Sequence, residues 1–216
     1  MSLFITLEGP EGSGKTTQLR LLESWLREQG HDTLATREPG GTKISEAVRA
    51  ILLDPENSEM RSEAEILLYS ASRAQIVGEV IRPHLERGTM VLCDRYADST
   101  LAYQGYGRQL DLDTLRTITA FATGGLVPDI TIYLDIAIEV GLHRKTDDEW
   151  NRLENQELAF HERVRAGYLQ MAQDEPDRWV VIDGSQPLLD IQMDIRACLA
   201  ELLPPLDTKS REGASH

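Results

Sequence analysis

Five short, mostly apolar or β-branched runs are spaced along the chain, and each predicts a buried β-strand. The runs are Leu3–Leu7, Thr33–Thr36, Thr89–Cys93, Ile130–Leu134 and Trp179–Ile182. Continuous apolar character, rather than strict alternation with polar residues, is typical of strands that are covered on both faces of a parallel sheet.

Longer stretches between these runs carry apolar residues at helical spacing. The predicted helices cover residues 17–26, 44–53, 62–87, 98–105, 112–123, 139–144, 154–174 and 188–203. Pro83 is expected to kink the end of the 62–87 helix, and residues 106–108 are expected to form a loop. Strands that alternate with helices predict an α/β fold with a doubly wound, parallel five-stranded sheet flanked by helices.

The length and net charge of the chain indicate how many domains it has and what kind of ligand it binds. The chain has 216 residues, of which 41% are hydrophobic and 27% charged, and its net charge is -14. This length fits one domain, which we place at residues 1–203; the polar segment 204–216 is expected to be a disordered tail. A strongly acidic chain is a poor candidate for binding a nucleic acid polymer, which requires a basic face, so a small anion in a locally basic pocket is the expected partner.

The cysteine content and the N-terminal sequence bear on the compartment. Cys93 and Cys198 are the two cysteines, and both are expected to be buried reduced thiols, as in cytoplasmic proteins. The chain enters its first strand without a basic leader segment, and no apolar run is long enough to span a bilayer. We therefore expect a cytoplasmic protein that is not associated with a membrane.

The candidate chemistry begins between the first strand and the first helix. The pattern G-x-x-x-x-G-K-[ST] is matched by Gly9, Pro10, Glu11, Gly12, Ser13, Gly14, Lys15 and Thr16, and Thr17 follows. This is the phosphate-binding P-loop, in which glycines let backbone N–H groups surround an anion at a helix N-terminus. Lys15 is predicted to reach the β- and γ-phosphates and Thr16 to bind Mg²⁺. The alternative is a Gly-rich turn that binds nothing, and the flanking strand and helix argue against it.

Charged residues follow two other predicted strands. Arg37 comes at the end of the second strand, and Asp94 and Arg95 come directly after the third. Because ligands of open α/β sheets bind at the carboxyl ends of the strands, these side chains are expected beside the P-loop, with Asp94 as a second Mg²⁺ partner. Tyr69 and Arg73 share one helix face at i, i+4 spacing, either as a surface cation over a ring or as a base-stacking ring beside a donor fork.

Several motifs in a fixed order resemble those of the thymidylate kinase family, over about residues 3–203. They are Glu8-Gly9 with Gly14-Lys15-Thr16-Thr17, Arg37-Glu38-Pro39-Gly40-Gly41-Thr42, Asp94-Arg95-Tyr96, Ala102-Tyr103-Gln104-Gly105, and Pro128-Asp129 before Tyr133-Leu134-Asp135. The P-loop alone is shared by many families, whereas the ordered set is much more specific.

The resemblance implies a reaction and a set of site residues. Such enzymes transfer the γ-phosphoryl group of ATP to dTMP with Mg²⁺, on a P-loop kinase fold that forms a homodimer. ATP would be held by the loop from Gly9 to Thr17, with Lys15 and Arg95 acting in catalysis. The residues that match the dTMP site are Glu11, Arg37, Tyr69, Arg73, Arg95, Thr100, Tyr103 and Gln104. Residues 183–187 match the loop near adenine, and the helices at 62–87 and 112–124 are the expected dimer surface.

The match weakens in the lid, placed at about residues 144–152. Related enzymes carry a catalytic arginine either in the P-loop or in the lid, and this P-loop has Gly12 at that position. The middle of the lid is acidic, and its cations are Arg144, Lys145 and Arg152. Arg152 is the first candidate for the catalytic cation and Arg144 the second.

Two alternatives to dTMP phosphorylation remain open at this point. A related kinase could phosphorylate a deoxynucleoside or another nucleotide; a neutral 5′-hydroxyl acceptor would then need a general base. The predicted phosphate contact of Arg37 argues against this. A catalytically weak nucleotide-binding protein is the second alternative, favoured by the acidic lid and opposed by the presence of Lys15, Thr16, Asp94 and Arg95.

Overall fold

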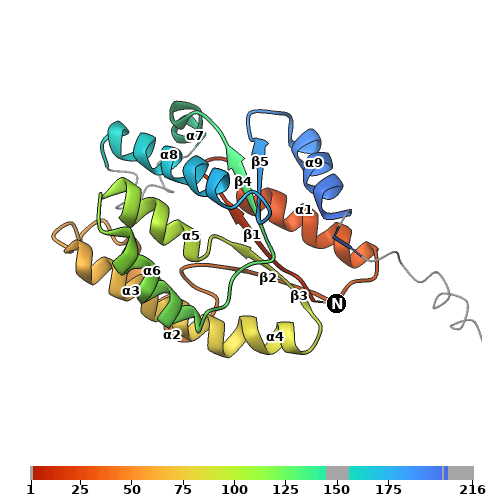
Figure 1. The fold of residues 1–216 in the computed structure, drawn as a ribbon, viewed down its shortest axis with the longest axis horizontal. Coiled ribbons are helices and arrows are strands. Elements are labelled where there is room, and N and C mark those ends of the chain that lie inside the picture. The colour runs from red at the N-terminus through yellow and green to blue at the C-terminus, as the bar shows by residue number, and fades with distance from the viewer. Residues whose placement is uncertain (1, 145–155, 201, 204–216) are drawn as a thin grey trace, which may run out of the picture.

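The computed structural model describes residues 2–144, 156–200 and 202–203, and all structural statements below refer to these residues (Figure 1). The strands are β1 (Phe4–Glu8), β2 (Thr33–Arg37), β3 (Met90–Asp94), β4 (Ile130–Asp135) and β5 (Trp179–Asp183). The helices are α1 (Lys15–Glu28), α2 (Lys43–Leu53), α3 (Ser62–Ile76), α4 (Arg82–Glu86), α5 (Ala97–Thr100), α6 (Leu112–Thr123), α7 (Ile138–His143), α8 (Leu158–Asp174) and α9 (Leu188–Ala200), with π-helical segments η1 (Val77–Ile81) and η2 (Leu101–Gly107).

The described strands form one parallel sheet in the order β2-β3-β1-β4-β5, which confirms the predicted fold class. In the register of the sheet, Asp94 lies opposite both Leu7 and Arg37. The ends of β1, β2 and β3 therefore meet at one edge. The residues that follow these strands are brought together there, as the sequence predicts.

Strand side chains alternate between two helical layers, and this covers the sheet on both faces. Ile5 and Leu7 pack with apolar residues of α1 and α9 in one core. Phe4, which directly precedes Ile5 in the strand, packs with Ile76 and Val91 in a second core on the other face. Figure 1 shows α1 and α9 side by side on one side of the strands, and α3, α5 and α8 on the other.

The predicted 62–87 helix runs through the expected range with a change of geometry. It is α-helical to Ile76, π-helical over Val77–Ile81 and α-helical again from Arg82. Pro83 lies at the start of the last segment, directly after the π-helical turn, and it has no N–H to donate to that turn.

One local prediction is wrong, because residues 106–107 are helical rather than part of a loop. They belong to η2, and Arg108 caps it. A Cβ atom on Gly107 would lie 2.6 Å from the ring of Phe160, so α8 packs directly on this glycine. Tertiary packing therefore extends the helix beyond the point where local glycine content predicts its end.

Two further predictions concern parts of the chain outside the described residues. The lid, apart from Arg144, falls within 145–155, and the tail comprises 204–216. Among the described helices, none combines the length and apolar character needed to cross a lipid bilayer.

Candidate active site

The P-loop connects β1 to α1, and its glycines are required by close backbone packing. Gly9 and Gly12 have φ of 153° and 70°. A Cβ atom on Gly9 would lie 2.7 Å from the carbonyl oxygen of Leu134, and one on Gly12 would overlap the carbonyl oxygen of Gly141. The first turn of α1 has no side-chain cap, so its N–H groups are available to an anion.

Lys15 is buried beneath this loop. Its Nζ donates to the carbonyl oxygens of Gly9 (3.1 Å) and Pro10 (2.8 Å) and more weakly to the hydroxyl of Ser13 (3.4 Å). Burial, together with the nearby positive charge of Arg95, lowers the pKa of Lys15 to about 8. A phosphate would supply the negative charge that this ammonium lacks.

A hydroxyl and a carboxylate meet at the start of α1 and the end of β3. The Thr16 hydroxyl donates to Asp94 Oδ2 at 2.5 Å. No cluster of three or more His, Cys, Asp or Glu side chains suited to a metal occurs among the described residues. Mg²⁺ is commonly bound by one or two protein oxygens together with substrate phosphates and water, so the pair fits the predicted role.

Arg95 is the most highly connected cation of the site. Its Nη2 donates to Tyr103 OH at 2.9 Å and forms an ion pair with Glu11, and its Nη1 donates to the hydroxyls of Ser99 and Tyr168 at 3.3 Å. Its backbone has φ of 67°, in the left-handed region that a non-glycine residue adopts at a cost. The pKa of Arg95 is raised despite its burial, because Tyr103 and the carboxylate of Glu11 face it.

A buried carboxylate supports Arg95 from below. Glu8 is fully buried at the end of β1 and accepts from Tyr96 N (2.8 Å), Ser99 Oγ (2.6 Å) and Tyr168 OH (2.7 Å). Burial raises the pKa of Glu8 to about 7, against the opposing effect of Arg95. The resemblance included Glu8 only as part of a motif; its role in holding the residues around Arg95 emerges from the fold.

Arg73 occupies the other end of the site. Its side chain is 2% exposed and donates to Glu38 Oε2 (2.7 Å), Thr100 Oγ1 (2.9 Å) and Tyr96 O (3.1 Å). A buried cation with three fixed partners is not the surface cation that the sequence left open. Arg73 also lines the cavity described below, and its role as a donor fork toward a ligand stays a prediction.

Arg37 and Arg49 add positive charge between the two ends. Arg37 donates to both carboxylate oxygens of Glu46 (2.9 and 3.1 Å) and remains 51% exposed. Arg49 of α2 donates to Pro39 O at 2.8 Å, and burial with the nearby charge of Arg37 lowers its pKa. No local pattern marks Arg49 as a site residue, since a single arginine on an amphipathic helix is usually a solvated charge.

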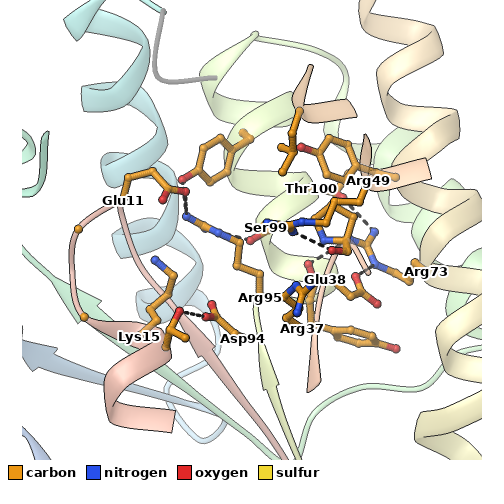
Figure 2. A pocket seen from close by; sticks show the side chains of 18 of the residues that line it. Glu11, Lys15, Arg37, Glu38, Arg49, Arg73, Asp94, Arg95, Ser99 and Thr100 are labelled. Carbon is orange, nitrogen blue, oxygen red and sulfur yellow. Dashed lines mark hydrogen bonds and ion pairs between the residues drawn. The ribbon is translucent and has the colours of Figure 1, made fainter. Parts of the chain in front are cut away.

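Most of these residues line one cavity of about 700 Å³, a size typical of small-molecule sites. Gly9, Pro10 and Ser13 of the predicted ATP site are not among the described residues that line it. The predicted site residues that line it are Glu11, Gly12, Gly14, Lys15, Thr16, Thr17, Arg37, Tyr69, Arg73, Asp94, Arg95, Thr100, Tyr103, Gln104 and Arg144. Figure 2 shows Lys15 and Asp94 at one end, Arg73 and Thr100 at the other, and Arg95 between them. Residues that the sequence did not assign to the site also line it, among them Arg49 and Ser99.

The structure describes only one of the two lid arginines that are candidates for the catalytic cation. Arg144 Nη1 lies 3.3 Å from Gly12 O and 3.4 Å from Gly184 O, between the P-loop and the loop after β5. Arg152, the first candidate for the catalytic cation, lies outside the described residues.

Comparison with known proteins supplies the family. The model of the thymidylate kinase family matches residues 7–195. The chain belongs to the thymidylate kinase family. It is 53% identical to the thymidylate kinase of Roseiflexus castenholzii, over 94% of this chain and 95% of the relative. The thymidylate kinases of Deinococcus radiodurans and Thermomicrobium roseum are 54% and 56% identical, over 92% and 87% of this chain and 97% and 89% of the relatives. The predicted family is confirmed, and these names support the predicted phosphorylation of dTMP.

Proposed function

We propose that this chain transfers the γ-phosphoryl group of ATP to dTMP, giving dTDP and ADP, with Mg²⁺ and in the cytoplasm. The observation that carries the proposal is that one cavity joins a P-loop to a separate set of arginines. Two nucleotides of like charge can approach each other there because cations offset their repulsion, and positioning supplies most of the catalysis in phosphoryl transfer.

The donor end is assigned to the P-loop residues Gly9 to Thr17. Backbone N–H groups and Lys15 would bind the ATP phosphates, and Thr16 and Asp94 would hold Mg²⁺, which would offset the negative charge of the phosphates. The hydrogen bond between Thr16 and Asp94 supports this assignment, because it brings both oxygens to one point beside the loop.

The acceptor end is assigned to residues around Arg95 and Arg73. Arg37 and Arg95 would bind the dTMP phosphate, with Glu11 holding Arg95 in place. Arg49 joins them in the proposal because it lines the same wall. Planar guanidinium groups suit this task since each binds two phosphate oxygens.

Base and sugar would lie toward Arg73. Tyr69 is assigned to stacking on thymine, and Arg73, Thr100 and Gln104 to its polar edge. Tyr103 would lie under the deoxyribose, where a packed ring disfavours an added 2′-hydroxyl by a factor on the order of 10². The contact of Arg95 with both the hydroxyl and the ring of Tyr103 supports a fixed position for that ring.

The acceptor is proposed to be a nucleotide rather than a nucleoside. A nucleoside 5′-hydroxyl needs a base, and the carboxylate of the P-loop itself, Glu11, is partly buried and already paired with Arg95. A nucleotide phosphate is ionised and needs no base. The cluster of Arg37, Arg49 and Arg95 favours the anionic acceptor.

Two further parts of the proposal concern the lid and assembly. Residues 144–152 would close over the phosphates, with Arg152 or Arg144 as the catalytic cation. The chain would form a homodimer through α3 and α6, and this is supported by two large apolar side chains exposed there, Leu67 (61%) and Phe121 (89%).

An acceptor screen tests the function. ADP release from ATP and Mg²⁺ is measured with dTMP, thymidine, UMP and CMP in turn. We expect dTMP to be phosphorylated far faster than the others. Faster turnover of thymidine would favour the nucleoside kinase, and no turnover with any acceptor would favour the binding protein without catalysis.

A further inference from the structure

The wall of the cavity that carries Gln104 is backed by a buried carboxylate, Glu65 of α3. Gln104 comes from η2 and lines the cavity, whereas Glu65 is fully buried and is not among the described residues that line it. Gln104 Nε2 donates to Glu65 Oε1 at 2.8 Å. The amide of Gln104 is thus held by a residue that does not itself line the cavity.

Arg108 pairs with this carboxylate through two hydrogen bonds. Its Nε and Nη2 donate to Glu65 Oε1 and Oε2 at 2.8 and 2.9 Å, a two-pronged pairing that favours the charged form. The guanidinium of Arg108 is itself fixed over the ring of Phe160, 5.7 Å from its centre. An ionised carboxylate accepts hydrogen bonds and donates none, so it binds the nitrogen of an amide and repels the oxygen.

The side-chain amide of Gln104 therefore has one favoured orientation. With Nε2 bound to Glu65, Oε1 is on the opposite side of the amide. No hydrogen bond to Gln104 Oε1 occurs among the contacts of the described residues. Turning the amide over would place its oxygen against the charged Glu65. The cavity is thus given a hydrogen-bond acceptor at this position and not a donor.

We propose that Glu65 is a positioning residue for base selection, which holds the Gln104 oxygen so that it accepts from the N3–H of thymine. The inference rests on the proposed function. Thymine and uracil carry a donor at N3, whereas cytosine carries an acceptor there. A cytosine ring would place two acceptors against each other, and Gln104 could not turn over to relieve this.

Arg73 adds to the same discrimination. Three of its five N–H groups are bound by Glu38, Thr100 and Tyr96 among the described contacts, which leaves two for a ligand. Donors suit the O4 carbonyl of thymine and repel the amino group that cytosine carries in its place. Arg73 and Gln104 thus present a donor and an acceptor, the complement of the thymine edge.

The test is the ratio of kcat/KM for dTMP to kcat/KM for dCMP. Glu65→Gln replaces the carboxylate by an amide that can face Gln104 either way, so we expect the ratio to fall at least tenfold. Glu79→Gln is the matched control, because Glu79 also accepts from a glutamine amide (Gln75, 2.7 Å) but is exposed in η1. An unchanged ratio in folded Glu65→Gln would overturn the proposal.

A double-mutant cycle separates positioning from general structure. In a Gln104→Leu chain the substitution Glu65→Gln should leave the ratio unchanged, because the amide through which Glu65 acts is gone. An equal fall in both backgrounds would show that Glu65 acts through the fold instead and would overturn the assignment.

A modified substrate tests the same contact in the natural chain, without any substitution in the protein. A dTMP analogue methylated at N3 lacks the donor, so we expect its kcat/KM to be at least tenfold below that of dTMP. Equal turnover would contradict the role of the Gln104 oxygen. Failure to phosphorylate dTMP itself would overturn the proposed function, whereas dTMP turnover with unchanged base selection overturns only the present inference.

Discussion

Gly12 of the P-loop and Gly141 of α7 pack backbone against backbone. A Cβ atom on Gly12 would overlap the carbonyl oxygen of Gly141, and one on Gly141 would overlap the carbonyl oxygen of Glu11. An arginine therefore cannot occupy position 12 without moving α7. This contact gives a physical reason to look for the catalytic cation elsewhere.

Gly141→Ala should disturb ATP binding although residue 141 does not line the cavity. The added methyl group must displace the P-loop at Glu11, and we expect the KM for ATP to rise at least tenfold. Gly78→Ala is the control, because a Cβ atom there meets no atom within 4 Å and the site is helical. A normal KM for ATP in a folded Gly141→Ala chain would show that the loop adapts without loss.

Arg152→Ala should lower kcat by at least 10² with little change in dTMP binding. A cation that contacts the phosphoryl group only in the transition state affects kcat, and such arginines contribute 10³–10⁵ in related phosphoryl transfer. Steady-state kinetics with equilibrium binding of dTMP measures both effects. Arg61→Ala, at an exposed position, is the control. A near-normal kcat would transfer the role to Arg144 or Lys145.

The sequence predicted the sheet and the cavity well because both depend on local patterns. Apolar runs marked all the described strands, and glycine spacing marked the P-loop. Parallel strands then bring Arg37, Asp94 and Arg95 to one edge whatever the details of the helices.

The supporting contacts could not be predicted in the same way. Glu8 and Tyr168 are far apart in sequence, as are Glu65 and Arg108, and nothing local marks them as partners. Residues 106–107 continue a helix only because α8 packs on Gly107. Such features depend on which elements meet, and this is information that spacing along the chain does not contain.

Asp94→Asn should weaken Mg²⁺ binding, so that the reaction needs a higher Mg²⁺ concentration. The substitution removes a charge from the oxygen that Thr16 contacts, so we expect the half-saturating Mg²⁺ concentration to rise about tenfold or more. Initial rates over a Mg²⁺ titration at saturating ATP measure this. Asp113→Asn, on the exposed face of α6, should not change it. An unchanged Mg²⁺ curve would remove Asp94 from the metal site.

Glu8 should make the fold less stable as the pH rises toward neutrality. Its pKa is raised by burial from an ordinary value of 4.5 to about 7. Between these values the folded chain keeps a proton that the unfolded chain releases, so the stabilisation is complete below pH 4.5 and lost by pH 7. A shift of this size corresponds to roughly 3 kcal/mol of unfolding free energy.

Urea unfolding of the natural chain and of Glu8→Gln measures this contribution. Glutamine resembles the protonated carboxyl group and does not titrate. The loss of unfolding free energy between pH 5 and pH 7.5 should therefore be smaller in the variant. Equal losses in the two chains would mean that Glu8 is ionised throughout.

Phe121→Asp should convert the proposed dimer to monomers. The ring is 89% exposed on α6, and a carboxylate at the centre of an apolar interface would be buried without a partner. Sedimentation velocity of the natural chain and the variant gives the oligomeric state. Leu189→Asp, which is 67% exposed on α9, is the control. A natural chain that sediments as a monomer would overturn the dimer itself.

Tyr168 connects α8 to the acceptor site through Arg95, Ser99 and Glu8, while the ring packs between Tyr133 and Trp179. The packing of α8 in the core and the proposed phosphate contact of Arg95 therefore depend on the same side chain. Repacking the inner face of that helix, at positions that never meet a nucleotide, would alter turnover. Inhibitor resistance could thus arise from core substitutions that leave every ligand contact in place.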